Sequence, residues 1–341
     1  MDRIDGLKQY VKNEKYRTAM ELPKDQTENY EFLAQGEYNI NYTFFHPVMN
    51  RKLVLRVNIG SQMHLEHQVE YEAHALKLLE SSGRTPKVLY VDGSREFFEY
   101  GILVMEYLPG ETLDYHLELP KAAECLADIH SVCLEESCGL LKPENPLKAI
   151  LEECEEMFAV YEKSNLGGPD KKSRIRGLLE KGWRQVNAYK NEETYRCCIN
   201  TELNSTNFLV NGPESAAYLI DWEKPLYADP AQDLGHFMAP TTTFWKTDVI
   251  LTEKEMEEFL NDYIKYVEGR YPTEGVKERA YLFARINCLR GITWCAMAWV
   301  EYQAPDKLIF NESTFKKLEA YLNLDFLEMI DKLIGECEEY S

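Results

Sequence analysis

The stretch Asn200-Thr201-Glu202-Leu203-Asn204-Ser205-Thr206-Asn207 decides how the rest of the chain is interpreted. It places a carboxylate and an amide five residues apart. Two apolar runs, 208–210 and 216–220, follow it around the turn Asn211-Gly212-Pro213. Apolar runs on both sides of such a turn predict a hairpin. The hairpin leads directly into Ile220-Asp221-Trp222, which brings a second carboxylate into the segment.

The bulk properties predict a folded protein of the cytoplasm with two lobes. A chain of 341 residues, 45% of them hydrophobic, is longer than one ordinary core supports. No apolar run approaches the roughly 18 residues of a membrane span. The opening residues, MDRIDGLKQYVKNEKY, contain no signal core, and the nine cysteines are scattered without a C-x-x-C pair. We therefore expect no membrane partner.

The net charge of −20 restricts the kinds of partner. Binding nucleic acid through its phosphate backbone needs a basic face, so we expect no nucleic-acid partner. An acidic protein can attract a cationic small molecule to an acidic cleft. The same charge can also serve solubility alone. No feature of the sequence sets an oligomeric state.

The first part of the chain predicts a small sheet with one packed helix. The strands are expected within 30–45, which holds two of them, and at 52–57, 87–92 and 100–107, and the helix at about 64–81. Arg56 lies in the middle of a strand otherwise suited to burial, and Glu72 fills a gap in the apolar stripe of the helix. Because a buried unpaired charge is costly, we expect these two side chains to form an ion pair. The alternatives are an edge-strand arginine and a glutamate in solvent.

The segment Leu108-Pro109-Gly110-Glu111 interrupts this pattern, and the chain is mostly helical after it. We expect a boundary there, with an N-terminal lobe at 1–107 and a helical C-terminal lobe at 108–341. Helices are expected at 120–133, 147–161, 172–189 and over most of the chain beyond 252. The predicted fold class is α+β, with a small antiparallel sheet lobe and a larger helical lobe.

Five short segments occur in order along residues 30–240. They are Leu103 to Gly110, Ala127-Asp128-Ile129-His130, Thr201 to Val210, Leu219-Ile220-Asp221-Trp222-Glu223 and Asp229-Pro230-Ala231-Gln232-Asp233-Leu234. Their order and spacing resemble the aminoglycoside phosphotransferase and choline kinase family. The last hundred residues carry little resemblance, and this family varies its substrate site there.

The resemblance implies a bilobal protein-kinase-like fold that binds ATP (or GTP) and Mg²⁺ between its lobes. The implied nucleotide-binding residues are Gly36, Asn39, Arg56, Glu72, Glu106 and Leu108. Gly36 is the only glycine in the segment that would cover the phosphates, Gln35 to Asn39, so this loop departs from a glycine-rich pattern. Asn207 and Asp221 would bind Mg²⁺, which prefers oxygen ligands. Asp233 would brace the catalytic loop.

Glu202 stands where the family has its catalytic Asp, and Asn200 replaces a loop His. Glu keeps the carboxylate and extends it by one methylene, and phosphoryl transfer depends chiefly on positioning and electrostatics. Three interpretations follow: an active small-molecule kinase with Glu202 as the catalytic residue, a nucleotide-binding pseudokinase that acts as a regulatory or binding module, or the same fold without nucleotide. The retained pair Asn207 and Asp221 favours the first two.

The expected acceptor is a hydroxyl group of a small molecule. The short span between Asp221 and Asp233 leaves no room for a protein-kinase activation segment. Trp245, Trp294, Trp299 and Tyr302, with Glu301, could form an aromatic and acidic pocket for an ammonium group, although core packing is the alternative for each tryptophan. Aminoglycosides, choline-like amino alcohols, sugars and thiamine-like compounds all stay open as substrates.

Overall fold

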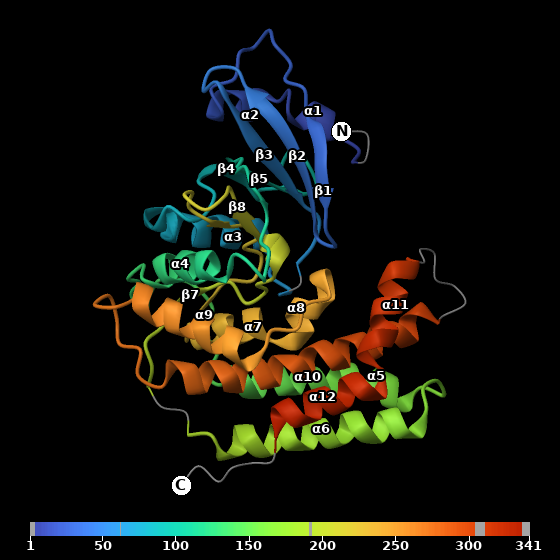
Figure 1. Cartoon of the computed structure of the whole chain (residues 1–341). Coiled ribbons are helices and arrows are strands. Elements are labelled where there is room, and N and C mark those ends of the chain that lie inside the picture. The colour runs from blue at the N-terminus through green and yellow to red at the C-terminus, as the bar shows by residue number, and fades with distance from the viewer. Residues whose placement is uncertain (1–3, 62, 191–192, 304–310, 336–341) are drawn as a thin grey trace.

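The computed structural model describes residues 4–61, 63–190, 193–303 and 311–335. A small antiparallel sheet stands at one end of the molecule and a larger helical body at the other (Figure 1). Two short helices, α1 (Leu7–Tyr10) and α2 (Glu14–Ala19), precede the sheet. Their apolar side chains join one face of the sheet in a single buried cluster. The predicted α+β class with a sheet lobe and a helical lobe is confirmed.

The sheet has five strands in the order β1-β2-β3-β5-β4, all antiparallel to their neighbours. The strands are β1 (Glu31–Gln35), β2 (Asn39–His46), β3 (Arg51–Asn58), β4 (Val88–Asp92) and β5 (Gly101–Glu106). Because β3 is the central strand, Arg56 lies between Asn41 on β2 and Leu103 on β5. An edge-strand arginine is thereby excluded.

Helix α3 (Gln68–Leu78) packs against β4 and β5 and carries Glu72. It begins later than the predicted position 64. His64 adopts a left-handed backbone conformation with φ of 55°, which a helix cannot contain. A 3₁₀ turn over Glu80–Ser82 follows α3, and Gly83 ends it at a φ of 67°.

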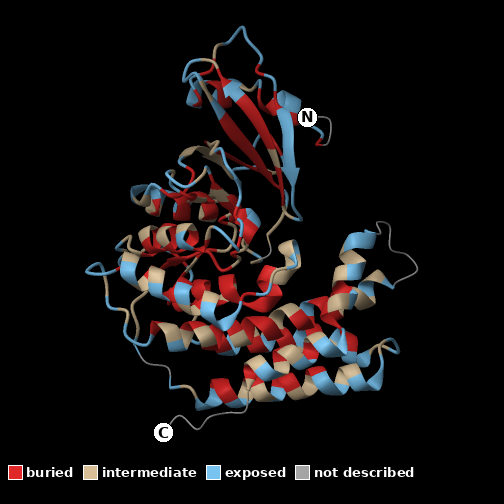
Figure 2. Ribbon diagram, viewed as in Figure 1, coloured by how far each residue is buried: buried red, intermediate tan, exposed pale blue. Residues whose placement is uncertain are grey.

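The helical body is built around α10, which contacts α5, α6, α7, α8, α11 and α12. Its helices are α4 (Leu119–His130), α5 (Pro146–Lys163), α6 (Pro169–Ala188), α7 (Ala231–Met238), α8 (Pro240–Thr247), α9 (Glu253–Tyr266), α10 (Val276–Tyr302), α11 (Glu312–Tyr321) and α12 (Leu324–Ile334). A helix surrounded in this way is buried on several sides, and Figure 2 shows this along α10. None of the described helices is both long and apolar enough to cross a membrane.

Helices α7 and α8 were not predicted as helices. The close packing of α7 on α10 depends on Gly235, because a Cβ there would lie 2.5 Å from the carbonyl oxygen of Ala280. Helix α8 approaches α10 at Gly291, where a Cβ would lie 2.5 Å from Cβ of Thr241. These two contacts fix the helices that follow the catalytic segment.

Short strands flank the segment 200–207 and hold it in place. β7 (Cys197–Ile199) pairs with β10 (Leu226–Ala228), and β8 (Phe208–Val210) pairs with β6 (Glu111–Thr112) and β9 (Tyr218–Leu219). The predicted hairpin at 208–220 is therefore confirmed. The chain between β7 and β8 contains the 3₁₀ turn η2 (Ser205–Asn207), and the chain between β9 and β10 contains Asp221.

Candidate active site

The loop that begins at Asn200 is cross-linked to the segment after Asp221. Asn200 Nδ2 donates to the carbonyl oxygen of Asp221 at 2.8 Å, and its Oδ1 accepts from the Glu202 amide at 3.1 Å. Thr201 Oγ1 donates to the carbonyl oxygen of Lys224 at 2.8 Å. The hydrogen bonds of Asn200 therefore support the loop, which is the role expected of the residue at this position.

The backbone of both segments is strained at one residue each. Thr201 has a φ of 74° and Asp221 a φ of 66°. Such values are unusual for residues other than glycine, above all for a β-branched one. The buried carboxylate of Asp233 accepts from the amides of Asn200 and Thr201, both at 2.7 Å, and His130 on α4 lies 3.2 Å from it. Asp233 braces the strained loop, as predicted.

Asn207 and Asp221 line a common cavity. Asn207 Nδ2 donates to the carbonyl oxygen of Glu202 at 3.0 Å, which fixes the orientation of the amide and leaves Oδ1 as its free ligand atom. One carboxylate and one amide oxygen suit Mg²⁺, which usually takes few protein ligands and completes its shell with water and phosphate.

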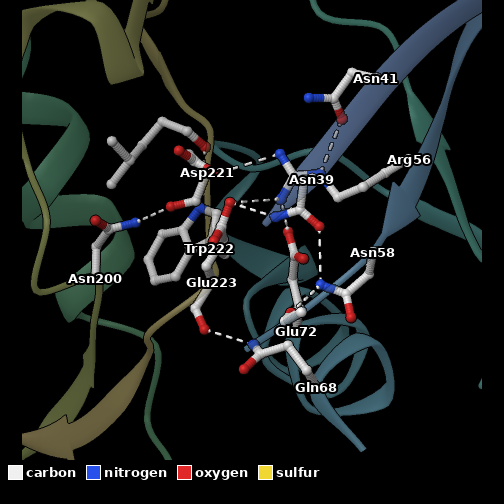
Figure 3. Close-up of polar contacts among 12 residues, drawn as sticks. Asn39, Asn41, Arg56, Asn58, Gln68, Glu72, Asn200, Asp221, Trp222 and Glu223 are labelled. Atoms are coloured by element: carbon white, nitrogen blue, oxygen red, sulfur yellow. Dashed lines mark hydrogen bonds and ion pairs between the residues drawn. The ribbon is translucent and has the colours of Figure 1, made fainter. Parts of the chain in front are cut away.

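Arg56 lies at the centre of a buried polar network (Figure 3). Its Nη1 contacts Glu72 Oε1 at 2.5 Å, its Nη2 contacts Asp221 Oδ1 at 3.2 Å, and its Nε donates to Asn41 Oδ1 at 3.0 Å. The predicted ion pair between Arg56 and Glu72 is confirmed, and a solvated Glu72 is excluded because only 1% of that residue is exposed. Burial raises the pKa of Glu72 in spite of the guanidinium beside it.

The network reaches across the lobes through Glu223. Asn39 Nδ2 donates to the Glu223 carboxylate, and Asn39 Oδ1 accepts from Asn58 at 2.9 Å. Gln68 Nε2 on α3 donates to the Glu223 carbonyl oxygen at 2.7 Å. The side chain of Asn39 is thus engaged by protein, so its contribution to phosphate binding would come from its backbone.

This cluster contains more carboxyl groups than cationic groups. Glu72, Asp221 and Glu223 surround the single guanidinium of Arg56. Burial and the nearby Asp221 raise the pKa of Glu223 to about 8. A divalent cation on Asp221 would supply the missing positive charge, so the donor set fits the implied Mg²⁺.

The remaining predicted nucleotide-binding residues lie in the β1–β2 turn and at the end of β5. Gly36 is exposed in the β1–β2 turn, where its amide donates to the Asn39 carbonyl oxygen at 2.9 Å. Glu106 ends β5 and pairs with Arg51 at 3.5 Å, and Leu108 is half-buried just beyond it. Their roles toward a nucleotide stay predictions.

Glu202 has a partner that the sequence did not reveal. Lys224 Nζ lies 2.8 Å from Glu202 Oε1. Burial opposes ionisation of Glu202, but Lys224 outweighs it and holds the pKa of this carboxyl below its usual range. Glu202 is therefore a positioned, ionised carboxylate at neutral pH.

Glu202, Asn207 and Asp221 line a cavity of about 340 Å³ that extends into the helical body. The other residues of its wall come mainly from α7, α8 and α10, namely His236, Thr241, Thr242, Trp245, Lys246, Asn287, Arg290, Gly291, Trp294 and Cys295, with Glu37, Glu153, Asn204 and Tyr321. Trp245 and Trp294 meet edge to face with ring centroids 5.3 Å apart. Residues 287, 290, 291, 294 and 295 follow the 3.6-residue repeat of one helix face, a spacing that could have been found in the sequence.

The predicted aromatic pocket is confirmed only for part of its residues. Trp245 and Trp294 line the cavity, but Trp299 packs edge to face on Tyr161 with ring centroids 6.0 Å apart. Tyr302 stacks on Phe315, and Glu301 is exposed away from the cavity wall. Trp299 lies five residues beyond Trp294, or about 140° around the helix, so the two rings face different sides.

The fold and this arrangement of groups define a protein-kinase-like phosphotransferase. A family model described as "Phosphotransferase enzyme family" matches residues 30–274, and the chain belongs to this family. No curated protein sequence matched the chain.

Solved structures with a similar fold include several small-molecule kinases. Choline kinase from Cryptosporidium parvum Iowa II is 13% identical at a TM-score of 0.64, covering 94% of this chain and 97% of that one. Spectinomycin phosphotransferase in complex with ADP and spectinomycin is 15% identical at a TM-score of 0.60, covering 88% and 91%. Ethanolamine kinase from Plasmodium vivax is 14% identical at a TM-score of 0.59, covering 89% and 84%. At these identities the likeness concerns the fold.

Proposed function

We propose that this phosphotransferase moves the γ-phosphate of ATP (or GTP) to a hydroxyl group of a small molecule. The observation that carries the proposal is the convergence of Glu202, Asn207 and Asp221 on one cavity beside Arg56. The three side chains come from two segments that are cross-linked by hydrogen bonds, so their relative positions are fixed before any ligand binds.

The residues have separate roles in the proposed transfer. Asn207 Oδ1 and the Asp221 carboxylate would hold Mg²⁺, which when bound neutralises charge on the phosphate oxygens. Arg56 would contact the phosphates, fixed in place by Glu72. The ionised carboxylate of Glu202 would accept a hydrogen bond from the acceptor hydroxyl, orient it in line, and take its proton.

The lobes divide these tasks. Residues 1–107 would bind the nucleotide through Gly36 and the backbone around Asn39, Glu106 and Leu108. Residues 108–341 would contribute the catalytic loop, the metal ligands and the acceptor cavity. Acceptors like those of the structural relatives, such as amino alcohols and aminocyclitols, are the starting set for assay.

Two experiments test this proposal. Thermal unfolding with and without Mg²⁺–ATP should show stabilisation that Asp221→Asn greatly reduces. A panel of hydroxyl compounds is then scored for ADP formation. Transfer that survives unchanged in Asp221→Asn would contradict the metal assignment, and no thermal shift at millimolar nucleotide would contradict the function.

A nucleotide-binding pseudokinase is the second candidate, and the Glu202–Lys224 contact is the observation that favours it. A lysine that occupies one carboxylate oxygen could keep Glu202 away from an acceptor. Glu202→Gln separates the candidates, because an enzyme loses turnover and keeps nucleotide affinity. A pseudokinase shows no turnover with any panel compound in the unaltered protein.

A further inference from the structure

A second cavity adjoins the first beneath the catalytic loop. It has a volume of about 170 Å³, and Thr201, Lys224 and Gln232 form part of its wall. Four residues line both cavities: Glu153 on α5, His236 on α7, and Asn287 and Arg290 on α10. These four form the junction between the acceptor cavity and the inner chamber.

The junction offers hydrogen-bond donors in excess. Asn287 is 5% exposed, and its Nδ2 has no hydrogen-bond partner among the described residues. Its Oδ1 faces His236 Nδ1 at 3.4 Å. Arg290 donates from Nε and Nη2 to Glu153 at 2.8 and 3.2 Å, and the hydrogens on its Nη1 are not used in this contact. A ligand group placed there meets mainly N–H groups.

The carboxylate of Glu153 at the junction is already paired with Arg290. Glu153 binds Arg290 through both oxygens. Glu202, which also lines the cavity, is paired with Lys224, and Asp221 is paired with Arg56. Apart from Glu37 in the β1–β2 turn, no carboxylate among the described residues of the cavity wall remains for an ammonium ion.

The cationic side chains of the cavity are less completely paired with carboxylates. Lys246 lines the cavity from α8 and forms no ion pair with a described residue, and Trp245 and Trp294 form an apolar wall beside it. The inner chamber is lined by Lys224 and Arg290, which are paired with Glu202 and Glu153, so among the described residues of the two walls Lys246 is the cation without an ion-pair partner. Deeper in the chamber, buried Gln232 has an Oε1 without a partner, which suits a hydroxyl or amide hydrogen of the same ligand.

We propose that the acceptor carries a carboxylate and that Arg290, Asn287 and Lys246 bind it at the junction. This inference rests on the proposed phosphotransfer and names the chemical class of its acceptor as a hydroxy acid. The carboxylate anchors the molecule, and the hydroxyl faces Glu202 across the same cavity. Arg290 and Glu202 line the same cavity, so one small molecule can reach both.

Protein-observed NMR of the nucleotide-free chain tests the site directly. The probes are three compounds of equal length, 3-hydroxypropionate, 1,3-propanediol and 3-amino-1-propanol, at constant ionic strength. The signals are the Asn287 side-chain amide, assigned with Asn287→Asp, and the indoles of Trp245 and Trp294. The anion should give saturable shifts with an affinity at least about tenfold above the other two, a difference that a single charged contact in a cavity can supply.

Two variants and a matched control complete the test. Asn287→Asp places a negative charge at the junction and should weaken the anion at least about tenfold, and Lys246→Gln about fivefold. Lys254→Gln, an exposed lysine on α9, should leave the affinity unchanged. Equal shifts by all three probes, preference for the amine or diol, or no saturable anion binding would each overturn the proposal. Stabilisation by Mg²⁺–ATP is measured in parallel, so loss of the carboxylate site is distinguishable from loss of the kinase function.

Discussion

Replacing Glu202 by Asp tests whether the longer side chain is a defect or an adaptation. The resemblance implies Asp at this position, and the substitution would withdraw the carboxylate by about 1.5 Å, the length of one C–C bond. The contact with Lys224 Nζ, now 2.8 Å, would then exceed hydrogen-bonding distance. If Glu202 and Lys224 form one positioned unit, Glu202→Asp lowers kcat/KM.

The size of the loss follows from two independent estimates. A charge-assisted hydrogen bond contributes about 1.5–3 kcal/mol. A misplacement of about 1 Å in the reacting geometry costs about a hundredfold in rate, or about 2.7 kcal/mol. Both estimates give a fall in kcat/KM on the order of a hundredfold, with Mg²⁺–ATP affinity nearly unchanged.

The assay is steady-state ADP release with the acceptor found in the panel, and thermal shift reports nucleotide affinity separately. Lys224→Met keeps the length of the side chain and removes its charge, and it should lower kcat/KM by a similar factor. The double variant should be little worse than either single one, because both remove the same contact. An Asp variant as active as the unaltered protein, together with a silent Lys224→Met, would refute the reasoning.

Three further predictions concern stability. Arg56→Met should lower the free energy of unfolding by about 3–5 kcal/mol in urea, because it leaves Glu72 buried and unpaired; a loss below about 1 kcal/mol would contradict this. Gly235→Ala should cost roughly 1–3 kcal/mol through the clash with α10, whereas Gly177→Ala in α6, which meets no atom within 4 Å, should stabilise by up to about 1 kcal/mol. Burial and the neighbouring arginine lower the pKa of His236 to about 4. The unfolded chain therefore binds a proton below about pH 6.5, whereas the folded chain binds it only near pH 4. The free energy of unfolding falls as the pH drops from about 6.5 towards 4. Between pH 7.5 and 5 this loss is about 2 kcal/mol in urea unfolding, and His236→Gln should remove it.

Much of the fold and part of the site could be predicted because local pattern and long-range structure agree there. Arg56 lies in an apolar strand and Glu72 lies in the apolar stripe of a helix, so each needs a charged partner. Because both side chains are buried, they pair with each other. Helices α7 and α8 were missed for local reasons. A glycine interrupts α7 at position 235, and α8 begins with β-branched threonines, so both have low intrinsic helix propensity. Packing on α10 stabilises them instead.

Most of the cavity wall could not be predicted, because its composition depends on where helices cross; only the helical spacing of its α10 residues is visible in the sequence. Trp294 and Trp299 are close in sequence but face different sides of α10, and Trp245 meets Trp294 only because α8 packs beside α10. The contact of Lys224 with Glu202 spans two loops whose separation is set by the β7–β10 pairing. Neither relation is encoded in a short motif.

The two departures that the resemblance implies, at Asn200 and Glu202, are consistent with each other in the structure. A single damaged residue would leave its neighbours as they were, with unmet hydrogen bonds or an unpaired charge. Here Asn200 bonds both to the Glu202 amide and to the Asp221 carbonyl, and the longer Glu202 reaches a lysine that is only three residues beyond Asp221. The strained Thr201 is held by Asp233 and by the Lys224 carbonyl. Strain and buried polar groups persist where the surrounding contacts over-determine them, and this combination is concentrated at functional sites. These contacts support the proposal that Glu202 acts as the catalytic carboxylate.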